Sequence, residues 1–469
     1  MSVRGIGPAA DDGPAGLPEL EYAAALAAIE ERGRYGVRLG LGRVRALLRA
    51  MGDPQLAVRG ALVGGTNGKG SVIALAGSAL RAAGYRVGET PKPHLVTYRE
   101  RIVVDGRPIA AADFARLVAE LLPLTARVAR RLGPPTEFEL LTAMVFRHFA
   151  SAGLDLALVE VGLGGRLDAT HAWDGGVAAI TTVGLDHMDR LGPTVTAIAR
   201  EKAAIIVRGD RAVAGATGDA LAVIRRRAAR MRVPLTVVRP APLLGWTRDA
   251  IRVELPVLGP TEIGLRGRHQ AVNVAVADAL LDALEVAGIA AVPPDARRLG
   301  YGSARWPGRL ELLHGAGAGG AVRDVLLDGA HNADGAAALA TAVEDLRPLL
   351  EGGTDATPPV LTVVWASMGD KDVAAMLAAL SASRSIAGAD VVCTAMDLPR
   401  AMPPEDVARA WRVALPDARV VVVPGPAAAL DHALATARGP IVVAGSLYLV
   451  GAARARLVDD PLLRDPVAA

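Results

Sequence analysis

The sequence predicts an α/β protein of two domains built on mostly parallel sheets. Apolar runs of strand length alternate with helical patterns along nearly the whole chain, which is typical of strand–helix–strand crossover units. A glycine-rich loop stands between the first predicted strand and its helix, where α/β proteins commonly bind ligands. The length of 469 residues suits two or three domains.

The composition is that of an ordinary globular protein, with 51% hydrophobic and 22% charged residues. The net charge of +3 offers no basic surface for nucleic acid. Cys393 is the only cysteine, so no disulfide can form within the chain. Residues 1–17 lack the apolar core of a signal peptide, and no uncharged apolar run is long enough for a membrane span. We therefore expect a cytoplasmic protein with neither a nucleic acid nor a membrane as partner.

The predicted elements of the first part are strands, helices and one hairpin. Glu160 and Asp186-His187 fall at or just past the ends of two strands, where the ligand crevice of an open sheet lies. The Asp105-Gly106 pair between two β-prone runs predicts the hairpin. The other predictions are strands over 61–64, 85–88, 154–162 and 177–184, and helices over 71–83, 112–132 and 136–152.

The second part begins with short β segments over 243–265 and a helix that starts near His269. The Pro- and Gly-rich stretch 292–309 then predicts a linker. We place the domain boundary after residue 306, which gives an N-terminal domain of 1–306 and a smaller, Rossmann-like C-terminal domain of 307–469. The strand and helix runs of the latter are VLLDGAHNADGAAALATAV, LTVVWASMGDKDVAAMLAAL, ADVVCTAM, ARVVVVPG and PIVVAGS.

The sequence GGTNGKGS, residues 64–71, is a candidate phosphate loop. Gly68 and Gly70 let backbone N–H groups turn toward an anion, Lys69 supplies a point charge, and the Ser71 hydroxyl can reach a magnesium ion. A glycine-rich turn that serves only packing is the alternative. The loop predicts a nucleotide site without naming a reaction, because kinases, GTPases and ligases all hold triphosphates in this way.

Lysine is rare, with four among 52 basic residues: Lys69, Lys92, Lys202 and Lys371. An ammonium is a compact charge that suits a phosphate, and only an amine can be carbamylated. Either these positions are functional, or the lysines merely survived a bias toward arginine. Lys202, on a predicted helix, could equally form a salt bridge near Glu201.

Glu160 and His187 could be purely structural, as lone carboxylates and histidines often are. Beside a phosphate loop, however, they become candidate metal ligands. Magnesium prefers oxygen, so Ser71 and Glu160 suit it, whereas His187 is a less typical ligand for a second ion.

Many ordered motifs resemble the folylpolyglutamate synthase and dihydrofolate synthase family of the Mur ligase superfamily. The resemblance covers about Tyr22 to Leu457 and implies an ATP-dependent, ADP-forming ligase of folate biosynthesis and one-carbon metabolism. Such an enzyme adds L-glutamate to a pteroate or folate carboxylate through an acyl phosphate, with Mg2+, between an N-terminal P-loop ATPase domain and a C-terminal domain. The motifs are GTNGKGS, PHL followed by ERI, FELLTA, VEVGLGGRLDAT, GLDHMDRLG, EKA, GRHQAVN, WPGRLE, LDGAHNADG, MGDKD and GSLYLVG.

The resemblance also implies residue roles. Glu160 and His187 would face metal, Lys202 would be carbamylated, and His94 and Phe138 would border the pterin. The catalytic residues would be Lys69, His187, Lys202 and Arg309. The ATP-binding residues would be Gly65, Thr66, Asn67, Gly68, Lys69, Gly70, Ser71, Asn273, Arg309, Asp328 and His331.

Three positions depart from the family pattern. Lys92 replaces a serine before Pro-His-Leu, His171 replaces an asparagine, and Ala204 replaces a glycine. Lys92 could take over part of a metal's role, pair with the acceptor's carboxylate, or simply face solvent between two prolines. The alternatives to a folate ligase are a related ligase for a non-folate acid and a regulatory nucleotide-binding module. We expect a monomer.

Overall fold

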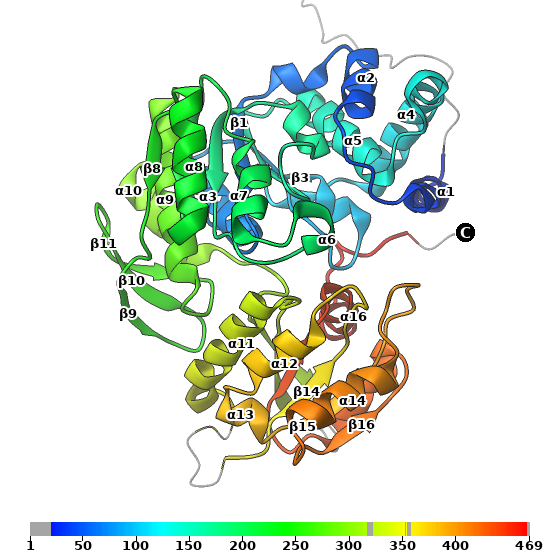
Figure 1. The fold of residues 1–469 in the computed structure, drawn as a ribbon, viewed down its shortest axis with the longest axis vertical. Coiled ribbons are helices and arrows are strands. Elements are labelled where there is room, and N and C mark those ends of the chain that lie inside the picture. Colours follow the sequence, from blue (N-terminus) through cyan, green and yellow to red (C-terminus); the bar gives the residue numbers. More distant parts are fainter. Residues whose placement is uncertain (1–19, 317–321, 352, 354–357, 467–469) are drawn as a thin grey trace, which may run out of the picture.

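The computed structural model describes residues 20–316, 322–351, 353 and 358–466. In this part of the chain two α/β domains lie against each other, the first above the second in Figure 1. Residues 1–17, on which the signal-peptide expectation rests, lie outside the described ranges. Within these ranges, no helix combines the length and the apolar character needed to cross a membrane.

An eight-stranded sheet forms the centre of the first domain. Its strands are β1 (Gly60–Gly64), β2 (Val87–Thr90), β3 (Val103–Val104), β4 (Arg107–Pro108), β5 (Leu156–Glu160), β6 (Gly176–Ile180), β7 (Arg211–Ala214) and β8 (Leu235–Val237). The order is β4-β3-β2-β5-β1-β6-β7-β8, with β3 and β4 antiparallel at one edge and the other pairs parallel. The predicted parallel sheet and the hairpin at Asp105-Gly106 are confirmed.

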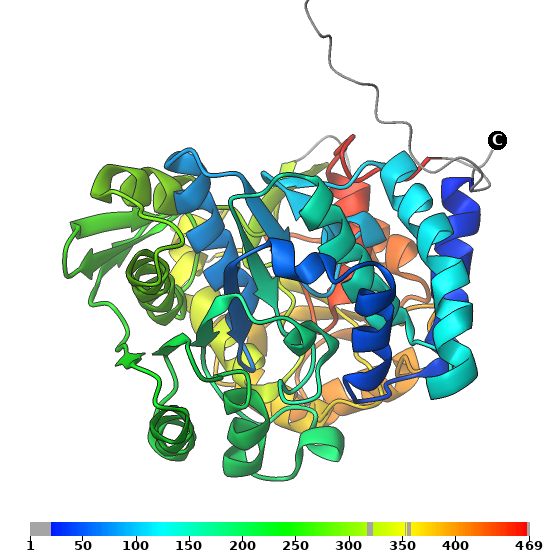
Figure 2. The same ribbon diagram turned by 90° about the horizontal axis from the view of Figure 1, so that it is seen from above.

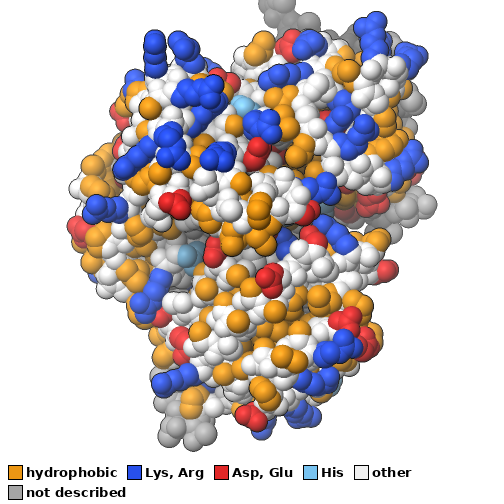
Figure 3. All heavy atoms as spheres, in the orientation of Figure 1, with side chains coloured by type: hydrophobic (Ala, Val, Ile, Leu, Met, Phe, Trp, Pro, Cys, Tyr) orange, Lys and Arg blue, Asp and Glu red, His pale blue; other side chains and the backbone are white. Residues whose placement is uncertain are grey.

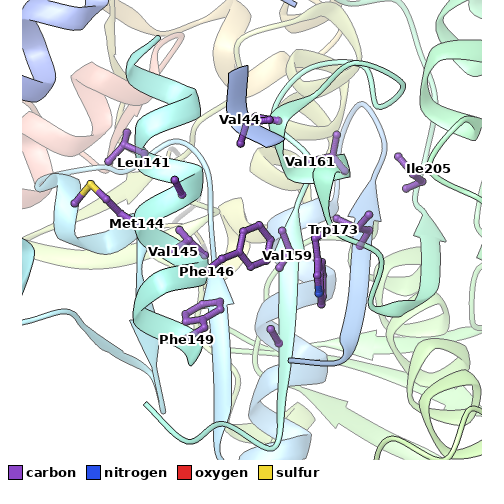
Figure 4. Packing of buried hydrophobic residues seen from close by; sticks show 14 of the residues in the cluster. Val44, Leu141, Met144, Val145, Phe146, Phe149, Val159, Val161, Trp173 and Ile205 are labelled. Atoms are coloured by element: carbon purple, nitrogen blue, oxygen red, sulfur yellow. The ribbon is translucent and has the colours of Figure 1, made fainter. Parts of the chain in front are cut away.

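Helices cover both faces of this sheet. They include α1 (Tyr22–Glu30), α2 (Gly42–Ala50), α3 (Lys69–Ala82), α4 (Ala111–Leu132), α5 (Glu137–Ser151), α7 (Val195–Ala203), α8 (Gly218–Met231), α9 (Gln270–Val286) and α10 (Pro294–Ser303). Leu156 and Leu158 of β5 pack with α3, α9 and α10, whereas Ala157 and Val159 pack on the opposite face with α5. Figure 4 shows Val159 beside Phe146 of α5. A strand buried on both faces reads as a continuous apolar run, as β5 does in the sequence.

Several element edges differ from the prediction; strand β6, for example, ends at Ile180 and not at Gly184. Helix α3 begins at Lys69 and not at Ser71, so the phosphate loop runs directly into it. Strand β2 begins at Val87 and not at Tyr85. The helix ends in a turn in which Tyr85 N–H donates to Leu80 O at 3.1 Å, so the chain becomes extended only after that turn.

A small antiparallel sheet extends from the first domain toward the second (Figure 1). Its strands are β9 (Leu243–Trp246), β10 (Ile251–Leu255) and β11 (Gly259–Ile263), in the order β11-β10-β9. These are the short β segments that the sequence predicts. Next to them, Arg248 donates to Asp324 Oδ2 at 2.9 Å and Arg268 donates to Asp345 Oδ2 at 2.6 Å. These ion pairs connect the two domains.

The stretch 292–309 is more than a linker, which corrects the sequence prediction. Its middle forms helix α10, which begins at Pro294, where the missing N–H would have no helical partner. Gly300 lies so close to Ala79 of α3 that an added Cβ would meet the backbone. The glycine therefore permits close helix packing and does not mark a loop. Trp306 still packs on the first domain's core, and Leu310 belongs to the second.

The second domain contains a six-stranded sheet. Its strands are β12 (Glu311–Ala316), β13 (Val322–Leu327), β14 (Thr362–Trp365), β15 (Asp390–Cys393), β16 (Val420–Val422) and β17 (Ile441–Ala444), in the order β12-β13-β17-β14-β15-β16. The first strand is antiparallel to β13 and is absent from the sequence prediction; the other pairs are parallel.

Helices cover both faces of this second sheet as well. On one side lie α11 (Ala333–Leu346), α12 (Val373–Leu380), α13 (Arg384–Ala387) and α14 (Pro404–Ala414). On the other side lie α15 (Pro426–Thr436) and α16 (Leu447–Leu457). After α16 the chain returns to the first domain, and Figures 1 and 2 both show the segment that follows this helix running toward α1. On the face in Figure 3, Lys and Arg side chains predominate over the first domain, whereas acidic and basic side chains are mixed over the second.

Candidate active site

The phosphate loop bends sharply between β1 and α3. Gly68 has a φ of 87° and lies so close to Asn273 that an added Cβ would meet the Oδ1 atom. The hydroxyls of Thr181 and Thr182 hold the loop by donating to Asn67 O, at 2.6 and 3.2 Å. A side chain at position 68 would strain the backbone and displace Asn273, so this turn requires glycine.

Lys69 folds back over the loop that precedes it. Its Nζ donates to Gly65 O at 3.2 Å and to Thr66 O at 3.0 Å, and lies 3.8 Å from Glu160 Oε1. All these partners belong to the first domain. An anion bound by the loop would therefore meet a positive charge that is already held in place.

Ser71 and Asn273 are connected through Gln270, to which the sequence prediction assigns no role. Ser71 is 5% exposed, and Gln270 Nε2 donates to its Oγ at 3.4 Å. Gln270 Oε1 accepts in turn from Asn273 Nδ2 at 2.8 Å. Helix α9 thus orients the first turn of α3 through two side-chain amides.

Glu160 is the last residue of β5, between β1 and β2, and is 3% exposed. Its Oε2 accepts from the backbone N–H of Lys92 at 2.9 Å, while Oε1 faces Lys69. Burial raises the pKa of this carboxyl, and the charges of Lys69 and Lys92 act against that rise. The two lysines therefore stabilise a negative charge at the carboxyl end of the strand.

The oxygens of Ser71 and Glu160 suit one divalent ion that also binds phosphate oxygens and water. Among the residues that the structure describes, no group of three or more His, Cys, Asp and Glu side chains is arranged to hold a metal ion by itself. His187, the other predicted ligand, precedes the short helix α6 (Met188–Leu191) with 40% of its side chain exposed. The donors therefore fit an ion carried by a nucleotide, and His187 as a ligand stays a prediction.

Helix α7 carries Lys202 to the phosphate loop, where Nζ donates to Gly65 O at 2.8 Å. Burial, together with the nearby charge of Lys69, lowers the pKa of Lys202 to about 7. A large fraction of the amine is then neutral at neutral pH. Because the neutral amine is the form that adds carbon dioxide, the site makes carbamylation chemically accessible.

Asp186 connects the two domains, a role that the sequence prediction does not assign. Its Oδ1 accepts from Lys371 Nζ at 2.9 Å and its Oδ2 from Asn332 Nδ2 at 3.1 Å. Asn332 also forms a reciprocal amide pair with Asn67 of the phosphate loop, at 3.2 and 3.4 Å. Although burial opposes ionisation, Lys371 and two neighbouring histidines hold the pKa of Asp186 well below its usual range.

All four lysines of the chain lie in this region. Two of them flank Glu160, a third donates to the phosphate loop, and Lys371 binds Asp186. The scarcity of lysine is the sequence signal that could have identified Lys371. Asn332 carries no comparable signal, since it reads as an ordinary helix cap.

Arg309 and Asp328 come from the start of the second domain. The Asp328 carboxylate accepts from the N–H groups of Leu310 and Ala330, at 2.9 Å each. Burial lowers the pKa of the Arg309 guanidinium, whereas Asp328 and Glu160 raise it. Arg309 therefore interacts electrostatically with one carboxylate from each domain.

His331 also belongs to the second domain. Its Nδ1 lies 2.8 Å from Gly329 O, and burial lowers its pKa to about 4. The imidazole is therefore neutral at neutral pH, with Nδ1 as donor to the carbonyl. Its Nε2 lies 3.9 Å from Asp186 Oδ2, so His331 stands at the domain contact described above.

A small cavity lies between the end of β2 and helix α5. Its volume is about 10 Å³, enough for one water molecule, so a ring-shaped ligand would require the wall to move. Figure 4 shows part of the apolar wall. The lining residues are Thr90, Lys92, Arg101, Phe138, Leu141, Thr142, Val145, Phe146, Val159 and Thr170.

Lys92 and Phe138, two of the predicted acceptor residues, meet at this cavity. Lys92 Nζ donates to Glu160 O at 2.6 Å and lies 4.8 Å from the centre of the Phe138 ring. Burial lowers the pKa of Lys92 to about 8. The alternative of a lysine that simply faces solvent is not supported. His94 does not line the cavity; its Nδ1 accepts from Arg101 Nε at 2.9 Å.

The segment from 91 to 101, here named the β2 loop, packs on the second domain. Leu95 lies against Gly451 of α16, where an added Cβ would meet the Leu95 backbone. Thr97 Oγ1 donates to Asp465 at 2.6 Å, and Arg99 Nε donates to the same carboxylate at 3.1 Å. The loop that carries Lys92 and His94 is therefore positioned in part by α16 and the segment that follows it.

Comparison with protein-family models matches residues 308–447 to the Mur ligase, glutamate ligase domain. Among curated relatives, the dihydrofolate synthase/folylpolyglutamate synthase of Mycobacterium tuberculosis is 35% identical over 466 residues, with 90% of each chain covered. The protein of the same name from Bacillus subtilis is 38% identical over 323 residues, which are 66% of this chain and 74% of that protein.

Solved structures of similar proteins have the same two-domain architecture. The M. tuberculosis folylpolyglutamate synthase complexed with ADP and AMPPCP gives a TM-score of 0.81 at 32% identity, covering 94% of this chain and 100% of that chain. E. coli FolC in complex with DHPP and ADP gives 0.75 at 27% identity, covering 93% and 98%. The Yersinia pestis bifunctional enzyme complexed with AMPPNP and a Mn ion gives 0.75 at 28% identity, also covering 93% and 98%.

Proposed function

Because this chain belongs to the folylpolyglutamate synthase and dihydrofolate synthase family, we propose that it joins L-glutamate to the carboxylate of a pteroate or folate acid. It is an ATP-dependent ligase, as are the relatives that match most of its length. One observation carries the proposal. Glu160 has the phosphate loop and Lys69 on one side, and the cavity lined by Lys92 and Phe138 on the other.

The reaction proceeds in two displacements. A carboxylate oxygen of the acceptor attacks the γ-phosphorus of ATP, and the bond from that phosphorus to the bridging oxygen breaks. ADP departs, and the acceptor is now an acyl phosphate. The amine of glutamate then attacks the acyl carbon and loses a proton, and inorganic phosphate departs from the new amide. Because neither step needs a covalent enzyme intermediate, the protein has to align the groups and offset their charge.

The residues of the first domain suit this task. The backbone N–H groups of the phosphate loop and Lys69 would bind the terminal phosphates. Ser71 and Glu160 would hold Mg2+, which offsets phosphate charge when bound. The Mn ion with a nucleotide analogue in the Y. pestis structure supports a divalent ion that accompanies ATP.

The second domain would complete the site. Arg309, Asp328 and His331 are proposed to contact ATP from residues 307–469, across the domain contact at Asp186. A closed pair of domains would also keep water from the acyl phosphate. A boundary after residue 306 is supported because Trp306 packs against a hydrophobic core of the first domain, whereas Leu310 belongs to a hydrophobic core of the second.

Lys202 is proposed to be carbamylated in the active enzyme. The support is a buried amine whose pKa is about 7, next to Gly65 of the phosphate loop. In the presence of 13C-labelled bicarbonate, the native protein should show a carbamate carbon signal by NMR that Lys202→Met lacks. An identical spectrum for both proteins would remove this assignment.

A related ligase for a non-folate acid is the second candidate, because two cations, Lys92 and Arg101, line the cavity. A regulatory module without ligase activity is not supported, since the relatives that match most of this chain are ligases. A cytoplasmic location and a monomeric state stay predictions.

The decisive experiment measures ADP formation with ATP, glutamate and either dihydropteroate or a tetrahydrofolate, followed by product mass. We expect ADP release that depends on both glutamate and a folate-type acid, and a product heavier by one or more glutamyl residues. Lys69→Ala serves as the inactive control. If none of the folate-type acids tried supports glutamate-dependent ADP release, the result would favour the second candidate.

A further inference from the structure

The side-chain amide of Asn332 reaches the first domain from the start of helix α11. It caps this helix, because its Oδ1 accepts from Gly335 N–H at 2.8 Å. The same oxygen accepts from Asn67 Nδ2 at 3.4 Å, while Nδ2 donates to Asn67 Oδ1 at 3.2 Å and to Asp186 Oδ2 at 3.1 Å. Asn332 is 7% exposed. Both donors and both lone pairs of its amide are therefore used, by two loops of the first domain and one helix of the second.

The two loops that Asn332 contacts form one unit of the first domain. They follow β1 and β6, which are neighbours in the sheet. Thr66 N–H donates to Thr182 O at 2.7 Å, and Gly184 N–H donates to the Thr66 hydroxyl at 3.1 Å. The Thr182 hydroxyl holds the backbone of Asn67, whereas, among the described residues, the Asn67 side chain hydrogen-bonds to Asn332 alone. The Asn67 amide is thus the part of the phosphate loop that the second domain fixes.

The first turn of α11 approaches the same unit closely. An added Cβ at Gly184 would meet the Asp334 carboxylate, so this turn packs on the backbone of the loop that follows β6. Asp328 and His331, two of the groups proposed to contact ATP, lie just before Asn332 in the chain. Because so short a connection joins them, the contacts of Asn332 determine where these groups stand relative to the phosphate loop.

We propose that Asn332 is a positioning residue for phosphoryl transfer, which acts through Asn67 to align the ATP-contacting groups of the second domain with the phosphate loop. Nucleotide binding relies on first-domain groups and should not need this contact. Transfer needs the groups of both domains in place, and a small misplacement of such groups lowers the rate strongly. Aspartate and serine cap helices as well as asparagine does, but the first has no donor and the second has one. The inference rests on the ATP-dependent ligation of the proposed function.

The test compares the full-length native protein with Asn332→Ser, which keeps an oxygen to cap α11 but loses the amide. ADP formation is measured with ATP, glutamate and dihydropteroate, and AMPPNP binding is measured by calorimetry. We expect kcat to fall at least about tenfold, while the Kd for AMPPNP changes less than about threefold and the melting temperature stays the same. In the AMPPNP complex, backbone amides of residues 65–68 and 184–187 should exchange hydrogen faster in the variant, which loss of a helix cap alone would not cause.

Two further variants serve as controls. Arg268 pairs with Asp345 across the domains at 2.6 Å and contacts neither loop, so Arg268→Ala should keep native kcat and native exchange in both segments. In an Asn67→Ala background, Asn332→Ser should lower kcat less than about threefold further, because the partner amide is already gone.

The outcomes distinguish the inference from the proposed function. Native kcat and exchange in Asn332→Ser, equal losses in Arg268→Ala, or fully additive losses in the double variant would overturn the inference. AMPPNP binding that weakens as much as kcat falls would also overturn it, because Asn332 would then serve nucleotide binding. If the native protein binds AMPPNP but forms no ADP with dihydropteroate or a tetrahydrofolate, the proposed folate acceptor is wrong, and the exchange comparison still decides the role of Asn332.

Discussion

The two loops on either side of Glu160 are built in different ways. The phosphate loop follows β1 and the β2 loop follows β2, and both strands neighbour β5 in the sheet. Apart from the amide pair between Asn67 and Asn332, the phosphate loop is held by residues of its own domain. The β2 loop is held from both domains: Glu160 and Glu100 of the first domain accept from its backbone N–H groups, and Gly451 and Asp465 of the second domain contact it as well.

This difference separates two halves of one site. The first domain can prepare the phosphate-binding half without the second, because most of its contacts come from α3, α7, α9 and the residues that follow β6, all within that domain. The half that carries Lys92 and His94 is held in addition by the second domain, through contacts of Leu95, Thr97 and Arg99. Changes in the two loops should therefore have different effects on nucleotide binding and on acceptor binding.

The largest effect is expected in the phosphate loop itself. Lys69→Ala should lower ligase turnover by at least about two orders of magnitude, since it removes a charge aimed at the phosphates. The fold should persist, because the ammonium contacts loop carbonyls and not the hydrophobic core. Steady-state ADP release and circular dichroism check the two parts. Arg116→Ala, at an exposed helix pair, is the control. Near-normal turnover would refute the assignment of the loop.

Arg309→Ala should affect turnover without abolishing nucleotide binding. The guanidinium comes from the second domain and interacts with Asp328 and Glu160. We expect a loss of about one to two orders of magnitude in kcat, typical of removing one charged group from a phosphoryl-transfer site. Equilibrium binding of an ATP analogue should change less than threefold, a smaller effect than one lost neutral hydrogen bond. A complete loss of binding would show that the first domain does not prepare the phosphate half alone.

Asp465→Ala should act on the β2 loop alone. The change removes the acceptor for Thr97 Oγ1 and Arg99 Nε, which costs about 1–3 kcal/mol of loop positioning. We expect KM for the acid to rise about tenfold, by the conversion of 1.4 kcal/mol, with nucleotide affinity unchanged. Asp459→Ala, an exposed aspartate of the same segment, is the matched control. Equal losses of nucleotide and acid affinity would erase the distinction between the loops.

The smallest effect concerns the pH dependence of stability. Burial and the charge of Arg101 lower the pKa of His94 to about 3, against about 6.5 in an unfolded chain. Between these values the unfolded chain binds more protons, so the free energy of unfolding falls as pH drops below 6.5, by at most about 1.4 kcal/mol per pH unit. His94→Gln should show a shallower fall in urea melts from pH 6.5 to 5. If the free energy of unfolding falls equally with pH in the native protein and in His94→Gln, His94 is not held neutral in the folded protein.

The fold was predictable where local patterns carry it. Strand-length apolar runs revealed the parallel sheet because its strands are buried on both faces, and the Asp105-Gly106 pair revealed the hairpin at its edge. Helix α10 was mistaken for a linker, because Gly300 serves close packing on α3 and reads like a loop residue. Strand β12 was missed, because its antiparallel pairing with β13 identifies it as a strand more clearly than the pattern of apolar residues in its own sequence does.

The sequence by itself determined the phosphate loop with Lys69 and Ser71, the position of Glu160 at a strand end, and the rarity of lysine. These features depend on spacing within one loop or one strand, which the order of residues sets directly. Only the tertiary structure decided that Lys371 binds Asp186, 185 residues away, and that Lys92 meets Glu160 across 68 residues. Such contacts depend on the order of strands in the sheet and on how the domains pack, and no local pattern encodes either.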